Sequence, residues 1–175
     1  MSAAALARPE AGEYAPYYER YVALVPEGDI VETLERQSAD TLSLLRSLTE
    51  EQGASRYAEG KWSVKEVVGH IIDTERVFTY RALCVARGDQ TPLPGYDQDD
   101  YARASNADSH TLASIAEHFR SVRAATLSLF RSFDAEAWRR RGTANNSVVT
   151  PRAIAHIVAG HELHHVGILR ERYLE

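Results

Sequence analysis

The amino-acid sequence predicts an all-α protein that folds as a four-helix bundle, and three observations support this prediction. Four segments, at about 30–52, 64–87, 110–133 and 151–172, carry apolar residues at helical spacing. Each segment follows a residue that favours a helix N-terminus. No stretch of useful length alternates apolar and polar residues, as a half-buried strand does. Four amphipathic helices bury their apolar faces most simply by packing on one another.

The first two helices begin at recognisable capping signals. Asp29 stands at the N-cap of the first, with Glu32 three residues later. Ser63 and Glu66 repeat this arrangement at the start of the second helix. Gly88 ends the second helix, because glycine readily adopts the left-handed conformation of a helix C-terminus.

A long loop, residues 88–108, separates the second helix from the third and is rich in proline, glycine and aspartate. Helix connections in bundles usually take about 2–8 residues, and a longer loop can cross the bundle. We therefore expect the second and third helices to run parallel. The third helix begins after Ser109 and keeps a seven-residue apolar repeat as far as Phe133.

The last helix has the clearest start, with Thr150 at the N-cap and Pro151 at the first helical position. Before it, Asp134 is expected to cap a short helix over 135–138. Residues 142–149 are rich in turn-forming residues and predict a second loop.

Residues 1–28 carry three prolines and four tyrosines without a long helical period. They predict an irregular arm with one helical turn, whose tyrosines pack on the bundle. Fraying is expected for about the first ten residues. The length of the chain suits one domain better than two, so we expect residues 1–175 to form a single domain.

Composition argues against several classes of protein. The net charge of −5 does not favour binding to nucleic acids or anionic membranes, which attract clustered Lys and Arg. No apolar run approaches the ~20 residues that span a bilayer, and the N-terminus lacks a signal-peptide core. A lone cysteine, Cys84, fits a reducing compartment. We expect a cytoplasmic protein with neither nucleic-acid nor membrane partners.

Histidine is the unusual residue of this chain, because four of its seven histidines lie between His156 and His165. At 100° per residue, His161 and His165 both fall near the middle of the apolar stripe of the last helix. They are one turn apart, so both imidazoles can reach one metal ion. The alternative is a pair of core histidines that donate to backbone carbonyls. We favour the metal, because burying both imidazoles without partners costs several kcal/mol.

A third ligand is expected from the second helix, where His70 lies within the inward arc. Three histidines with an open fourth position are typical of a catalytic rather than a structural metal site. The remaining histidines are expected to be structural or on the surface: His110, His118, His156 and His164.

Residues 161–165 also match the H-E-x-x-H pattern of zinc proteases, in which the glutamate acts as general base. Glu162 points about 100° away from His161 on a helix, which makes it a poor ligand. No histidine follows His165, so this alternative is the weaker one.

Other polar residues are candidates for supporting roles. Glu66 and Asp73, one turn either side of His70, are expected either to orient it or to be solvated charges. Arg76 and Arg81 are expected either to bind an anionic substrate or to lie on the surface. Three hydroxyl residues interrupt apolar stripes and are expected either to line a polar cavity near the metal or to be satisfied within the core: Ser38, Thr41 and Thr126.

Two segments resemble a known family. Residues 60–76, GKWSVKEVVGHIIDTER, resemble the second-helix motif of the DinB superfamily of metal-dependent hydrolases, and residues 156–167 resemble its last-helix motif. Residues 21–29 and 91–97 are similar to one branch of the family. The likeness covers nearly the whole chain.

The resemblance implies a four-helix bundle with up-down-down-up order. It also implies a divalent metal, zinc or nickel, held at the positions of His70, His161 and His165. Dimers are common in the family, so a homodimer is expected. Its better-understood relatives transfer or use low-molecular-weight thiols such as mycothiol and bacillithiol. Where the family often has arginine after the last ligand, this chain has Val166, which puts any contact of that arginine in doubt.

Two classes of function therefore compete. The first is a metal-dependent enzyme that acts on a small-molecule substrate through an activated water or thiol, as a hydrolase or a thiol S-transferase. The second is a non-catalytic, metal-stabilised, stress-related binding module. The sequence names neither the substrate nor the thiol.

Overall fold

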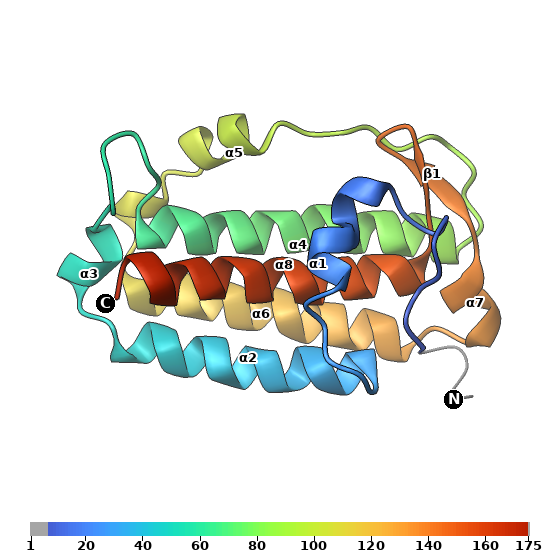
Figure 1. Cartoon of the computed structure of the whole chain (residues 1–175), viewed down its shortest axis with the longest axis horizontal. Coiled ribbons are helices and arrows are strands. Elements are labelled where there is room, and N and C mark those ends of the chain that lie inside the picture. Colours follow the sequence, from blue (N-terminus) through green and yellow to red (C-terminus); the bar gives the residue numbers. More distant parts are fainter. Residues whose placement is uncertain (1–6, 175) are drawn as a thin grey trace.

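The structure is a computed structural model that describes residues 7–174. Its four long helices are α2 (Ile30–Ser47), α4 (Val64–Ala86), α6 (Leu112–Arg131) and α8 (Pro151–Arg172). They lie side by side, and the sequence colours of Figure 1 show α4 and α6 running in one direction and α2 and α8 in the other. The predicted up-down-down-up bundle is confirmed. Both α4 and α2 pack against α6 and against α8.

Local capping signals place the starts of three helices where the sequence predicted them. The Asp29 carboxylate accepts the first free backbone N–H groups of α2. Ser63 and Glu66 form a reciprocal capping box at the start of α4. Thr150 accepts from the backbone N–H of Ala153, and α8 follows. Each cap satisfies donors that a helix cannot satisfy internally.

The first helix is shorter than predicted. It ends at Ser47, and a separate helix α3 (Glu50–Ala54) follows behind its own cap, Thr49. The start of α6 also differs, because Thr111 rather than Ser109 is its N-cap. Ser109 ends the short 3-10 helix η3 (Ala107–Ser109), and its hydroxyl donates to the carbonyl of Asn106.

The crossover from α4 to α6 contains a helix that the sequence analysis missed, α5 (Gln98–Ala104), capped by Asp97. Arg81 fastens this crossover, donating to the carbonyl of Pro94 at 2.7 Å. The backbone of Leu93 also bonds to Thr143 and Asn145 in the next loop. Figure 1 shows α5 above α4 at the end of the bundle opposite the hairpin.

The predicted short helix is present as α7 (Ala135–Arg139), capped by Asp134. The loop after it is an antiparallel hairpin of β1 (Gly142–Ala144) and β2 (Ser147–Val149). Two asparagines with positive φ form its turn, a conformation that asparagine adopts more readily than most residues. Strands of three residues are too short for alternation to reveal them.

The N-terminal arm packs on the bundle, as expected, through the 3-10 helix η2 (Pro16–Tyr18) and α1 (Glu19–Val22). Figure 1 shows α1 lying across α8. Tyr21 is buried and Tyr18 is half-buried, whereas the ring of Tyr17 is exposed. Part of the expected frayed segment, residues 1–6, lies outside the described residues. Within the described part of the chain, no helix is long and apolar enough to cross a membrane.

Candidate metal centre

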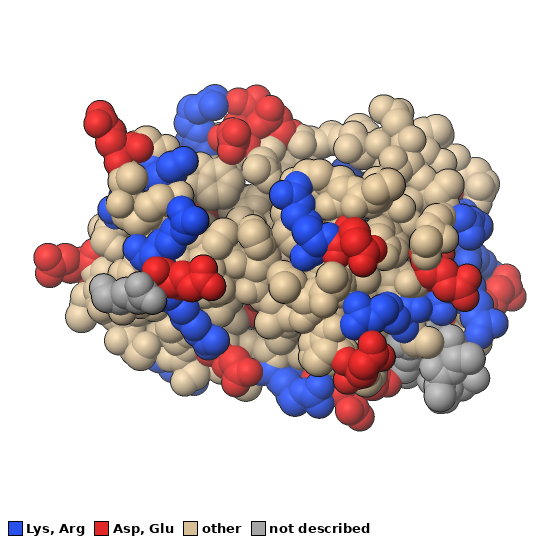
Figure 2. Space-filling model, in the orientation of Figure 1, with Lys and Arg blue, Asp and Glu red and all other residues tan. Residues whose placement is uncertain are grey.

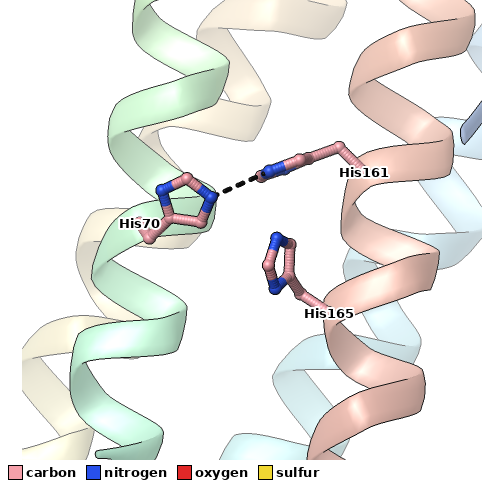
Figure 3. A group of neighbouring side chains, drawn as sticks. All are labelled: His70, His161 and His165. Atoms are coloured by element: carbon pink, nitrogen blue, oxygen red, sulfur yellow. Dashed lines mark hydrogen bonds between the residues drawn. The ribbon is translucent and has the colours of Figure 1, made fainter. Parts of the chain in front are cut away.

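Three histidines from two helices meet in the interior of the bundle. His161 and His165 lie one turn apart on α8, and His70 faces them from α4 (Figure 3). The Nε2 atoms of His70 and His161 are 2.9 Å apart. The ring centroid of His165 lies 4.9 Å from that of His70 and 4.4 Å from that of His161. The predicted convergence of these residues is therefore present.

The donor set fits a single small cation. One ring nitrogen from each histidine lies within 4.8 Å of the other two. Ligands at about 2.0–2.1 Å from a tetrahedral zinc ion are about 3.4 Å apart, so small side-chain rotations suffice. Borderline-soft imidazole nitrogens suit zinc, nickel and other divalent transition metals, whereas calcium and magnesium prefer oxygen.

Burial keeps these imidazoles neutral at neutral pH. It lowers the pKa of His70 to about 4. Burial, with the neighbouring histidines, lowers the pKa of His165 to about 3 and that of His161 well below its ordinary value. The neutral imidazole is the form that binds a metal, so no proton has to be displaced at neutral pH.

The second nitrogen of His70 points away from the other histidines, toward the hydroxyl of Thr74. The distance from Nδ1 to Oγ1 is 3.4 Å, and Thr74 Oγ1 lies 2.7 Å from the hydroxyl of Tyr96 in the crossover. Such partners fix the ring and tautomer of a metal ligand. Thr74, one turn beyond His70, was detectable from its i+4 spacing, whereas Tyr96 was not.

Glu66 and Asp73 do not orient His70. Glu66 is used in the capping box and in an ion pair with Arg56. Asp73 pairs with Arg76 at 3.2 Å in a largely exposed position, so Arg76 is a surface charge. These residues follow the second of the two expectations for them.

The other histidines stay out of the group. His156 is buried, but its Nδ1 lies 3.0 Å from the carbonyl of Arg152, one turn earlier on α8. His164 is half-buried and packs edge-on against Tyr21. His110 and His118 pack against each other near the start of α6.

Glu162 takes part in a second buried polar cluster, on the other side of α8. Arg123 on α6 donates to both carboxylate oxygens of Glu75 on α4, at 2.9 and 2.8 Å, and to Glu162 at 2.7 Å. It also donates to the carbonyl of Leu34, and Thr41 donates to Glu162 at 2.6 Å. We call this set of five residues the Arg123 cluster.

The Arg123 cluster joins all four long helices and decides two alternatives. Both oxygens of Glu162 are bonded to the cluster, so Glu162 is not placed as a general base beside the histidines, and the protease interpretation fails. Of the two expectations for the hydroxyl residues, satisfaction within the core is the one that holds for Thr41 and Thr126. Thr41 belongs to the cluster, and Thr126 donates to the carbonyl of Val122 in its own helix. Ser38 lines neither cavity beside the histidines.

Two cavities open beside the histidines. The larger, about 690 Å³, reaches His165, and we call it the His165 cavity. Its lining includes Trp62, which packs on His70, and three cationic residues: Arg56, Lys61 and Arg103. The smaller, about 380 Å³, reaches His161 and is the His161 cavity. Asp99 of α5 borders both, so this helix stands between the two openings.

Comparison with known proteins places this fold and histidine site in one superfamily. The sequence model of the DinB superfamily matches residues 33–169, most of the chain. The chain therefore belongs to the DinB superfamily. It is 32% identical over 73 residues to a protein of Oceanobacillus iheyensis that is provisionally named a metal-dependent hydrolase. That match spans 41% of this chain and 40% of the relative.

Two solved structures share the fold. YfiT from Bacillus subtilis, provisionally described as a metal-dependent hydrolase and noted for an unusual four-helix-bundle topology, matches with a TM-score of 0.73 at 16% identity. That match covers 93% of this chain and 89% of YfiT. A mycothiol-dependent maleylpyruvate isomerase matches with a TM-score of 0.65 at 12% identity, over 78% of this chain and 58% of the isomerase. At these identities the likeness establishes the fold alone.

Proposed function

We propose that His70, His161 and His165 bind one divalent metal ion, zinc or nickel, and that the protein is an enzyme acting on small molecules at this site. The observation that carries the proposal is the arrangement of the three imidazoles, of which His70 and His161 are buried and His165 is half-buried. Their nitrogens face one another, with no carboxylate within the group that they form. A cation is the partner that satisfies all three lone pairs at once.

A divalent ion in this position lowers the pKa of a water or thiol bound to it, which supplies a nucleophile near neutral pH. The residues of the chain prepare the site for that chemistry. Thr74 orients His70, while the rings of Trp62 and Tyr21 pack against His70 and His161 and limit the access of water. The two cavities give substrates access to His165 and His161.

Both a hydrolase and a thiol-dependent enzyme agree with this site. The names of the Oceanobacillus relative and of YfiT support hydrolysis. The fold shared with a mycothiol-dependent isomerase supports a low-molecular-weight thiol as co-substrate. Two separate cavities favour the thiol, because a thiol and its acceptor need two places whereas hydrolysis needs one organic substrate.

Elemental analysis of the purified protein, followed by metal titration, tests the metal. We expect about one zinc or nickel ion per chain and its loss in His161→Ala. His156→Ala is the matched control, because His156 is equally buried in the same helix but bonds to a carbonyl. Absence of stoichiometric metal, together with an unchanged metal content in His161→Ala, contradicts the proposal.

Assays with and without a chelator then separate the two classes of function. We expect chelator-sensitive turnover of simple esters or amides, or transfer of glutathione, bacillithiol or mycothiol to an electrophile. A protein that binds metal but turns over none of these fits the alternative, a metal-stabilised stress-related binding module. The homodimer and the cytoplasmic location stay predictions, which light scattering and cell fractionation test.

A further inference from the structure

The N-terminal arm forms one wall of the His161 cavity. Four of the residues that line this cavity come from the arm: Ala15, Tyr17, Tyr18 and Tyr21. The arm precedes residues 33–169, the part of the chain that matches the superfamily. The wall therefore comes from a part of the chain that the sequence model of the superfamily does not cover, and it lies directly beside a histidine of the site.

The arm is fastened as a fixed wall rather than held as a mobile lid. The buried carboxylate of Glu13 accepts from the hydroxyl of Thr150 at 2.8 Å and pairs with Arg152. Arg8, near the start of the arm, bonds to the end of the arm by donating to the carbonyls of Val22 and Val25, at 2.7 and 2.6 Å.

Gly160, directly before His161, permits the closest approach of the arm. A Cβ at this position would lie 2.0 Å from the carbonyl oxygen of Tyr21. The backbone of α1 thus rests on the backbone of α8, and the Tyr21 ring packs edge-on against His161 with centroids 5.3 Å apart. This contact sets the depth of the cavity over the histidine.

Several aromatic rings line the His161 cavity, together with polar side chains such as Thr74, Gln98 and Asn145. Besides the three arm tyrosines, Phe78 and Tyr96 border it, and the rings of Tyr18 and Phe78 pack edge-to-face at 5.7 Å. Burial raises the pKa of Tyr18 and Tyr96, so these phenols stay neutral and can donate hydrogen bonds. Flat rings with neutral donors recognise other flat rings and carbonyl oxygens.

The charges of the two cavities differ. The described residues that line the His161 cavity include Asp97 and Asp99 but neither Lys nor Arg. The His165 cavity is lined by Arg56, Lys61 and Arg103 as well as by acidic residues. Figure 2 shows charged side chains of both signs gathered around α5 and the α3 end of the bundle. It shows a largely uncharged surface between α1 and the hairpin.

We propose that the His161 cavity binds a neutral, planar, conjugated small molecule, and that the arm tyrosines set this preference. The proposal rests on the proposed function, because it assigns a substrate class to the same histidine site. The cavity volume of about 380 Å³ suits a molecule with a single ring or with two fused rings. In the metal-free protein, the carboxylates of Asp97 and Asp99 disfavour an anionic ligand in this cavity.

Equilibrium binding of three probes of similar size tests the preference. The probes are 2-acetylnaphthalene, its saturated decalin counterpart and 2-naphthoate, each titrated into apo and metal-loaded protein and followed by NMR. We expect the planar ketone to bind about threefold to tenfold more tightly than the saturated ketone and than the carboxylate. Equal affinities, preference for the carboxylate, or no binding of any probe up to its solubility overturns the proposal.

Variants of Tyr18 link the preference to the arm. We expect Tyr18→Leu to abolish the difference between the planar and saturated ketones, and Tyr18→Phe to keep most of it. Tyr57→Leu is the matched control, because Tyr57 lines the His165 cavity instead. A planar preference that persists in Tyr18→Leu contradicts the role of the arm.

The outcome separates this inference from the proposed function. A planar preference in a protein that binds no metal leaves the cavity assignment standing and removes the metal proposal. Stoichiometric metal binding without any preference for the planar ketone leaves the metal proposal standing and removes the cavity assignment. Gly160→Ala provides a second variant, since the added methyl displaces α1. We expect Gly160→Ala to weaken the binding of 2-acetylnaphthalene to the apo protein at least as much as Tyr18→Leu does. An unchanged affinity would contradict the role of the arm as a fixed wall of the cavity.

Discussion

Two buried polar groups lie on different faces of α8, and they are built in opposite ways. In the Arg123 cluster, every carboxylate oxygen of Glu75 and Glu162 meets a donor. In the histidine group, the Nε2 atoms of His70 and His161 lie 2.9 Å apart, at hydrogen-bond distance, and the group holds three imidazoles and, among the described residues, no charged partner. Glu162 directly follows His161 in the sequence, so the Arg123 cluster and the histidine group include adjacent residues of α8.

The difference indicates which polar group serves the fold and which serves a ligand. A buried charge that stabilises a structure has its partners within the protein, because an unpaired one costs several kcal/mol. Under the proposed function, a cation completes the three imidazoles, whose ring nitrogens lie within 4.8 Å of one another. The same helix thus carries a structural face toward α2 and α6 and a functional face toward α4.

The largest expected effect is on the structural face. Arg123→Met leaves Glu75 and Glu162 buried without a counter-charge, and we expect the free energy of unfolding to fall by about 3–5 kcal/mol. Chemical denaturation of the apo protein measures this. Arg131→Met is the control on the same helix, because its pair with Glu35 is exposed and should contribute at most about 1 kcal/mol. Equal losses in the two variants would remove the distinction between the faces.

Metal binding at the histidine face should raise the free energy of unfolding of the protein. At a zinc concentration about 100 times the dissociation constant, the folded protein gains about 2.7 kcal/mol. We expect this gain in the wild type and in His156→Ala, and its absence in His161→Ala. Thermal or chemical denaturation with and without zinc provides the measurement. An undiminished gain in His161→Ala would place the metal elsewhere.

Acid should destabilise the apo histidine face. The pKa of His70 is about 4 in the folded state, below the ordinary 6.5, so the unfolded state takes up protons first as the pH falls. This contribution is complete above pH 6.5 and is lost between 6.5 and 4. Between pH 7 and 5 we expect the wild type to lose about 2 kcal/mol more than His70→Gln. Parallel losses in denaturation experiments at the two pH values would show that His70 stays solvated.

The smallest effect concerns the orientation of one ligand. Thr74→Val removes the hydroxyl beside His70 Nδ1, and we expect zinc affinity to fall about tenfold, or about 1.4 kcal/mol. Competition with a chelating dye measures the affinity. Thr79→Val is the control, because the Thr79 hydroxyl donates to carbonyls of its own helix. Equal affinities for the two variants would show that Thr74 does not orient the ligand.

Local signals explain how much of this structure the sequence predicted. The caps at Ser63 and Thr150 lie within four residues of the groups they bond, so the helix starts were readable. The i, i+4 spacing of His161 and His165 likewise showed that they share a face. The convergence of His70 with them is present, while metal binding by the three residues stays a prediction.

The features that were missed depend on contacts between distant parts of the chain. Arg123 is 48 residues from Glu75 and 39 from Glu162, and no local pattern pairs them. The one available signal was Arg123 itself, a charge four residues after Phe119 on an otherwise apolar stripe. The helix α5 and the hairpin were missed because their stability comes from the crossover contacts rather than from long periodic patterns.

The contact at Gly160 has a consequence for engineering the arm. Because the arm meets α8 backbone to backbone there, a side chain at position 160, directly before His161, would clash with the backbone of Tyr21. We expect the arm to be transferable to a bundle that has glycine there and the equivalents of Thr150 and Arg152, which hold Glu13 of the arm. Exchanging arms among DinB bundles that have this glycine would change the wall of the cavity and leave the histidines in place.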